Sequence, residues 1–232
     1  MMLLAHAWTL AQQTPDEPQA VPLLDFVLAG GVIGGVIIAL SVVALALVVM
    51  HLVQIRAAAF APPELVTELD ELLHTGEPKA DAALELCAEP ANRCMLTAVL
   101  GAGLDRARRS ALGALELRSS MEEAAAAEVA RFYRSTDALA LIAAIAPMLG
   151  LLGTVVGING AFGTISSTEG FARQEQLAGD ISLALTTTIM GLVLAIPATA
   201  GVTFFRNRID GLAQLAGDEA ERLAAPVEQH AD

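Results

Sequence analysis

The sequence contains few charged and few aromatic residues. Only 17% of its 232 residues are charged and 4% are aromatic, whereas 55% are hydrophobic and the mean hydropathy is +0.58. A soluble domain carries about a quarter charged residues, so this composition is typical of an integral membrane protein. The 13 Lys and Arg residues form no dense basic run, which argues against nucleic-acid binding. We assign the net charge of −13 to solvated parts outside the apolar runs.

Enzyme motifs are missing as well. We find no Walker loop, no His/Glu zinc spacing and no Gly-x-Ser-x-Gly sequence, so we expect no enzyme, no cofactor and no metal site. The two cysteines, Cys87 and Cys94, flank Pro90 and fit neither a metal pattern nor a catalytic Cys/His pair. We interpret them as small core residues in a reducing compartment, with a redox pair as the alternative.

Three runs without Asp, Glu, Lys or Arg are long enough to cross a bilayer, for which roughly 20 apolar residues suffice. They cover 26–53, 138–168 and 181–205. The segment between the first two predicts one amphipathic helix that begins at Pro62-Pro63 and a second that ends before Pro90. Helix-favouring sequence over 104–136 then predicts one long helix, or two with a bend, that runs into the second span. The predicted fold class is an all-α membrane protein with three transmembrane helices and long cytoplasmic helical extensions.

Basic residues predict the orientation. Nine lie in 54–136 and three after 205, against one in 163–180 and none before 26, and positive charge stays inside. A weak signal peptide over 1–11 is one alternative for the start, although it lacks a basic residue. The predicted order is a periplasmic N-terminal segment (1–22), transmembrane helix 1 (23–53), a cytoplasmic helical domain (54–136), transmembrane helix 2 (137–162), a periplasmic loop (163–180), transmembrane helix 3 (181–205) and a cytoplasmic C-terminal helix and tail (206–232).

Small residues recur three or four positions apart in the second and third spans. In the second span the stripe continues to Gly160 or Ala161. Such a stripe lets the backbone of another helix come close, which is how membrane helices gain packing contacts. We expect a kink at Pro147 in the second span that is supported by neighbouring helices. The residues predicted to serve helix packing are Pro147, Gly150, Gly153, Gly157, Gly191 and Pro197.

Hydroxyl groups, not acids, lie in the middle of these spans. Thr188 is eight residues below Asp180 and Thr154 is eight below Phe162, roughly 12 Å in each helix. We therefore predict that Thr154 and Thr188 lie at a similar depth and form a polar ring, with Asn159 and Thr187 as further polar candidates. The alternative is that each threonine bonds to a carbonyl of its own helix.

Residues 146–158 (APMLGLLGTVVGI), closed by Phe162, resemble the signature of the MotA/TolQ/ExbB proton channel family. Residues 184–188 (ALTTT) and 191–198 (GLVLAIPA) resemble the matching segment of the TolQ/ExbB-like branch. The resemblance implies an inner-membrane subunit that forms a homo-oligomeric ring, five-fold in this family. A one-span ExbD/TolR-like partner would supply a proton-carrying membrane Asp.

In that complex the proton motive force would drive transport or mechanical work on an outer-membrane or periplasmic client. The resemblance carries the pore threonines over to Thr154 and Thr188. This sequence departs from the family pattern at Leu183, where transport members commonly have Glu. A non-conducting membrane scaffold ring is the alternative function.

Overall fold

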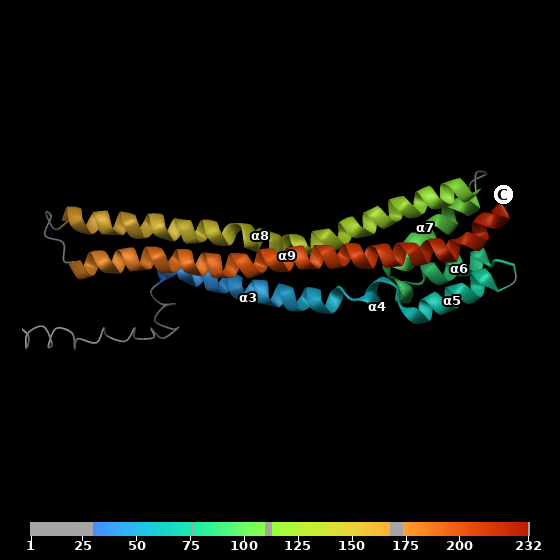
Figure 1. Cartoon of the computed structure of the whole chain (residues 1–232), viewed down its shortest axis with the longest axis horizontal. Helices are drawn as coiled ribbons and strands as arrows, with labels where there is room; N and C mark the ends of the chain where they lie inside the picture. The colour runs from blue at the N-terminus through green and yellow to red at the C-terminus, as the bar shows by residue number, and fades with distance from the viewer. Residues whose placement is uncertain (1–29, 76, 110–112, 168–173, 232) are drawn as a thin grey trace, which may run out of the picture. The chain divides into compact units, whose positions relative to one another are not determined.

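The computed structural model describes residues 30–75, 77–109, 113–167 and 174–231. Within these ranges the chain is helical and contains no strand, which confirms the all-α prediction. Three of the helices contain stretches long and apolar enough to cross a membrane: α3, α8 and α9. The elements are α3 (Gly31–Gln54), α4 (Ala57–Phe60), α5 (Pro63–His74), α6 (Ala80–Ala88), the 3-10 helix η1 (Pro90–Asn92), α7 (Met95–Arg109), α8 (Gly113–Ser167) and α9 (Gln174–Ala231) (Figure 1).

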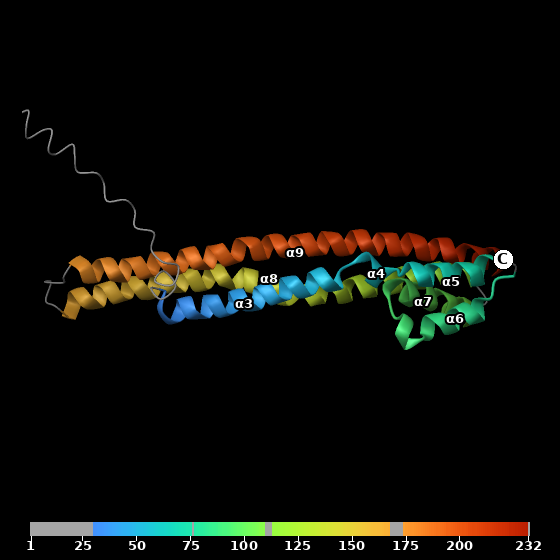
Figure 2. The same cartoon turned by 90° about the horizontal axis from the view of Figure 1, so that it is seen from below.

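The structure divides into two compact units, each of which contains parts of the long helices. Of the described residues, the first unit comprises those up to Ile37 together with those of Leu149–Met190, and the second comprises those of Ile38–Met148 and those from Gly191 onward. In the first unit, the end of α8 and the start of α9 lie side by side (Figures 1 and 2). In the second unit, the short helices α5, α6 and α7 pack with the other parts of α8 and α9 (Figure 2).

Amphipathic sequence explains the short helices of the second unit. Pro63 occupies the first turn of α5, where its missing N–H costs no hydrogen bond. The apolar face of α5 is buried through Leu65, Leu69 and Leu73, as the spacing predicts. Where α7 meets α8, a β-carbon on Gly103 would stand 2.5 Å from Met121 Cγ, so a larger residue here would require the Met121 side chain to move.

A polar cluster joins α8 to α9 next to the uncharged runs. The Tyr133 hydroxyl donates to the Asp210 carboxylate, and the Arg206 guanidinium lies 5.5 Å from the centre of the Tyr133 ring. Arg206 also donates to Asp137 at 3.1 Å and to the Thr136 hydroxyl at 3.3 Å. These groups hold the two helices together where apolar sequence gives way to charged sequence.

The helices extend further than the sequence predicts. The predicted loop 163–180 is helical at both sides, because α8 continues to Ser167 and α9 begins at Gln174. The Thr164 hydroxyl donates to Asp180 at 3.3 Å and so links these two helix ends. At the other end, α9 runs through Pro226 to Ala231, because buried packing just before that proline, at Leu223 and Ala224, outweighs the lost backbone hydrogen bond.

The structure also shows how the helical domain joins the second span. Of the two alternatives for 104–136, the structure has two helices, because α7 ends at Arg109 and α8 begins at Gly113. Helix α8 then continues without interruption into the apolar run. The predicted signal peptide and the first residues of transmembrane helix 1 lie outside the described residues.

Candidate functional site in the first unit

The predicted stripe of small residues on α8 is buried, and its partner is α9 of the same chain. A β-carbon on Gly150 would stand 3.0 Å from Thr188 Cα, and one on Gly157 would stand 2.7 Å from the Asp180 carbonyl oxygen. The Gly157 distance is shorter than real β-carbons show, and the Gly150 distance is tighter than nearly all of them, so both glycines let the helices come close. The stripe continues through Ala161, which is buried, and not through Gly160, which is exposed.

Thr188 links the two helices by a hydrogen bond. Its hydroxyl lies 3.1 Å from the Gly150 carbonyl oxygen of α8 and 3.3 Å from the Ala184 carbonyl oxygen of its own helix. The side chain is only half-buried. A donated hydrogen uses the single O–H, whereas the oxygen keeps acceptor capacity, so the exposed side of Thr188 presents a hydrogen-bond acceptor.

Thr154 matches the alternative interpretation, a bond within its own helix. Its hydroxyl donates to the Leu151 carbonyl at 2.6 Å, and the side chain is half-buried. Gly150 lies opposite Thr188 and Gly153 lies opposite Thr187, so Thr154 stands within one helical turn of the level of Thr188. The shared depth and the polar ring stay predictions.

The two further polar candidates lie in different environments. Thr187 is fully buried and bonds to the Leu183 and Ala184 carbonyls of its own helix. Its Cβ would stand 2.5 Å from a β-carbon on Gly153, so Thr187 belongs to the helix contact and not to an open surface. Asn159 is exposed on α8.

Leu183, the departure from the family pattern, makes an apolar contact at the start of α3. Its Cδ1 atom lies 3.4 Å from the position that a β-carbon would take on Gly31. Gly31 has a φ of +57°, a conformation that favours glycine. The side chain at position 183 therefore packs against backbone, and the Glu expected from the resemblance is replaced by a hydrophobic contact.

The remaining predicted packing residues belong to the second unit. Pro147 is half-buried within α8, and Gly191 is buried in α9. Pro197 is exposed and lines an apolar groove of about 530 Å³ between α3 and α9. The residues that line this groove include no ionisable side chain, so the groove offers no proton-binding group.

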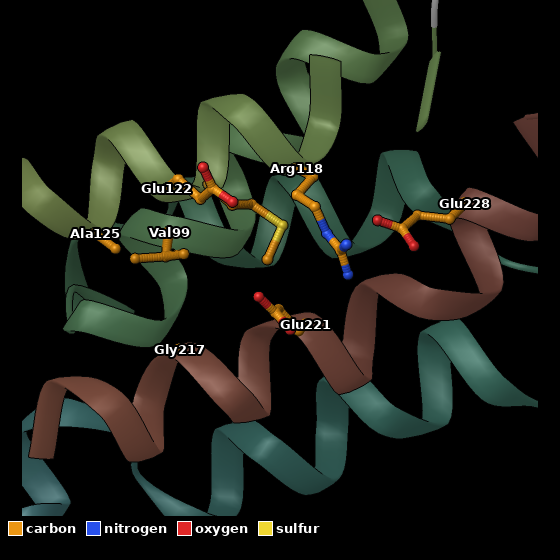
Figure 3. A pocket seen from close by; sticks show the side chains of 8 residues that line it. Val99, Arg118, Glu122, Ala125, Gly217, Glu221 and Glu228 are labelled. Atoms are coloured by element: carbon orange, nitrogen blue, oxygen red, sulfur yellow. The ribbon is translucent and has the colours of Figure 1, made fainter. Parts of the chain in front are cut away.

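A small cavity in the second unit has a different character. It measures about 70 Å³ and lies among α7, α8 and α9. Arg118 of α8 extends toward Glu221 and Glu228 of α9, with Glu122 at the opposite side (Figure 3). In the described ranges, no three His, Cys, Asp or Glu side chains are grouped so that they could hold a metal ion.

His51 is a functional candidate that sequence reasoning misses. It is the only ionisable side chain of the run 26–53, and that property could have identified it. Its ring is fully buried. Intramembrane ionisable groups are functional candidates by default.

Three apolar helices and a glycine-mediated contact between α8 and α9 define a helical membrane protein. Residues 92–216, more than half of the chain, match the model of the MotA/TolQ/ExbB proton channel family. The chain belongs to this family.

Curated relatives carry ExbB names. The chain is similar to the biopolymer transport protein exbB1 of Vibrio cholerae, with 39% identity over 98 residues, 42% of this chain and 38% of the relative. It is similar to the putative biopolymer transport protein ExbB-like 3 of Synechocystis, with 32% identity over 145 residues, 62% of this chain and 65% of the relative. ExbB of Salmonella typhimurium shares 38% identity over 98 residues, 42% of this chain and 40% of that protein. The matches thus span about a third to two thirds of these relatives.

Proposed function

We propose that the chain is a subunit of a proton-driven inner-membrane complex that couples the proton motive force to transport or mechanical work across the envelope. Family membership and the ExbB names of the relatives support this function. The single observation that carries it is the half-buried hydroxyl of Thr188, which bridges α9 and α8 within the runs 138–168 and 181–205, whose described residues include no acid. A threonine at this place can bind a carboxyl group but cannot itself carry a proton through the membrane.

The carboxyl group would come from a small one-span ExbD/TolR-like partner with a membrane Asp. In the described part of the first unit, the uncharged runs contain no acid, and we assign the proton carrier to the partner. Membrane acids are costly unless they are paired or hydrogen-bonded. Thr188 and Thr154 supply polar partners for it.

The direction of the threonine hydrogen bonds favours the protonated form of the partner's carboxyl group. Both hydroxyls already donate to carbonyls, Thr188 to Gly150 and Thr154 to Leu151, so their oxygens are arranged to accept. A protonated carboxyl group donates its O–H to such an acceptor. After deprotonation, the carboxylate needs a donor, and the threonine hydroxyl must turn away from its carbonyl to provide one. The site thus binds the neutral acid without rearrangement and the charged form only after it.

Assembly and orientation belong to the same proposal. Large apolar side chains of the first unit are exposed in the single chain and are available to lipid or to other copies, including Leu151, Leu152, Val155, Val156, Ile158 and Phe162 of α8 and Leu185 and Ile189 of α9. We place the N-terminus in the periplasm and the helical domain and C-terminal tail in the cytoplasm, from the distribution of basic residues. A homo-oligomeric ring, most simply a pentamer, would surround the partner helix.

The test is reconstitution with the partner. The chain is purified with the product of a neighbouring gene that encodes one membrane span with an Asp, and both are placed in vesicles that contain a pH-sensitive dye. Proton uptake under an imposed gradient should require both proteins and should be lost when the partner Asp is changed to Asn. A stable complex that conducts no protons with the native partner would contradict the proposal and favour the scaffold function.

A further inference from the structure

The apolar groove of the second unit is open to its surroundings. It measures about 530 Å³ between α3 and α9, and Leu139 of α8 forms part of its wall. Ser41 is the single polar residue among those that line it. Three of its large side chains are more than half exposed, Leu45 at 66%, Leu52 at 56% and Phe204 at 52%. Because its lining residues belong to helices that can cross a membrane, the acyl chains of a bilayer can reach it.

The groove has about the length of one bilayer leaflet. Along α3 it extends from Ser41 to Leu52, and along α9 from Leu194 to Phe205, roughly 16 Å in each helix. Half of a hydrocarbon core of about 30 Å is about 15 Å. In both helices the groove ends close to where charged sequence begins. It therefore runs from the middle of a bilayer to the surface of one leaflet.

Two exposed arginines stand at that surface end of the groove. Arg208 lies four residues after Phe204 on α9, and residues spaced by four share one face of a helix. Arg56 lies four residues after Leu52, just beyond the end of α3. The Arg208 Nε–H donates to the Ile55 carbonyl at 2.9 Å, which places Arg208 beside the segment that carries Arg56. The end of the groove is therefore positively charged.

The acids that α8 and α9 carry near this end have other partners. Asp137 of α8 binds Arg206 at 3.1 Å, and Asp210 of α9 accepts from the Tyr133 hydroxyl. In the part of the chain that the structure describes, neither of the two arginines at the groove is bonded to a carboxylate. Their positive charge is available to an anion from outside the chain. A guanidinium presents a planar fork of donors that matches the oxygens of a phosphate group.

We propose that this groove is a binding site for an anionic phospholipid of the leaflet that borders the helical domain. One acyl chain lies along α3 and α9, against Leu45 and Phe204, and the phosphate group binds Arg56 and Arg208. Basic pockets between membrane helices bind anionic head groups in this way. The proposal lies beyond the proposed transport function, since it requires only that the three apolar helices lie in a bilayer.

Photo-crosslinking locates the lipid. The full chain is reconstituted in phosphatidylcholine vesicles that contain a small share of phosphatidylglycerol with a photoreactive group on one acyl chain, and labelled residues are identified by mass spectrometry. Label should concentrate on Leu45 and Phe204, ahead of Leu151 and Val155, which are similarly exposed but lie in the first unit. Equal labelling of all four would mean ordinary lipid contact and would overturn the proposal. So would a groove without label whose residues cross-link to a second copy of the chain.

Matched variants test the two parts of the site. A basic residue near the membrane surface strengthens binding to anionic lipid by about fivefold, so Arg56→Gln should reduce the groove label about fivefold and the double variant with Arg208→Gln roughly 25-fold. Arg134→Gln, a change at an exposed arginine of α8, should leave the label unchanged.

Gly201→Leu tests the groove itself. A β-carbon there would make an ordinary contact of 3.7 Å with Leu139, and the longer side chain would occupy the groove and should abolish its label. A photoreactive phosphatidylcholine should label the groove of the native chain weakly. Equal labelling by both lipids, or a groove label that Arg56→Gln does not change, would contradict the proposal.

Discussion

Thr187 of α9 lies directly against Gly153 of α8, with its Cβ atom 2.5 Å from the position of a β-carbon on that glycine. Thr187 is fully buried there. Because no side chain can occupy the glycine position, the contact sets how closely the two helices approach. Gly150 and Gly157 make similar contacts a turn to either side. The three glycines thus form the surface on which Thr188 reaches across to α8.

We therefore predict that Gly153→Ala destabilises the helix pair, because the added methyl group collides with Thr187. Overpacking of this kind costs about 1–3 kcal/mol. Combining it with Thr187→Gly removes the colliding Cβ and should restore part of the loss. The measurement is the thermal midpoint of the purified protein in detergent or nanodiscs.

Gly163→Ala is the matched control. Gly163 lies on the same helix, and nothing lies within 4 Å of a β-carbon at this position. Alanine favours helix over glycine by about 1 kcal/mol, so this variant should be neutral or slightly stabilised. If Gly153→Ala behaves like Gly163→Ala, the close approach of α8 and α9 is not required.

Tyr133 allows a pH prediction, because it is the single tyrosine of the chain. The hydrogen bond to Asp210, with smaller contributions from desolvation and the Asp210 charge, raises the pKa of Tyr133 above its usual value of 10. A raised pKa means that the bond stabilises the fold below pH 10 and that this contribution is lost as the pH rises through the higher value. Absorbance titration of the phenolate should show a midpoint above 10.

Asp210→Ala should lower that midpoint toward 10, because both the acceptor and the negative charge are removed. Asp218→Ala, another exposed acid on α9, should leave it unchanged. An unshifted midpoint in Asp210→Ala would mean that the carboxylate does not bind the phenol in solution.

Cys87 should be an unreactive thiol. Burial, and then the charge of Cys94, raise the pKa of Cys87 to about 12, and only the thiolate reacts with alkylating agents. In a Cys94→Ser background, alkylation at pH 8 should be far slower in the folded protein than in denaturant. Equal rates would show that the thiol is accessible and ionised, as a redox pair would require.

Much of the fold follows from periodicity within single segments. The spacing of Leu65, Leu69 and Leu73 predicts the buried face of α5, and the uncharged runs predict the three apolar helices. Likewise, the stripe of small residues on α8 predicts a close contact between helices. Each of these features depends only on the order of residues within one helix.

Features that depend on two distant segments could not be predicted. The bond from Thr188 to Gly150 joins residues 38 positions apart, and the register between their helices is set by how side chains interlock. For the same reason, no sequence pattern shows that His51 meets the Ser135 carbonyl, 84 positions away. The family resemblance pointed to both threonines, but only the structure separates the cross-helix hydroxyl of Thr188 from the intrahelical hydroxyl of Thr154.

The central claim is that Thr188 binds the proton-carrying carboxyl group of a partner. Thr→Val keeps the shape of the side chain and removes the hydroxyl. Hydrogen bonds between membrane helices are worth about 0.5–2 kcal/mol, so the occupancy of the site should change by roughly twofold to thirtyfold. Thr199, whose hydroxyl bonds only to the Ala195 carbonyl of its own helix at 2.8 Å, provides the matched control.

The decisive measurement is proton flux into vesicles that contain the chain and its one-span partner, with equal amounts of assembled complex for every variant. Thr188→Val should reduce the flux strongly and Thr154→Val should reduce it less, because the Thr154 hydroxyl bonds within its own helix and does not reach across to α9. Thr199→Val should conduct like the native complex. Full flux in a Thr154→Val, Thr188→Val double variant would contradict the account and leave both residues as ordinary threonines of the helix contact.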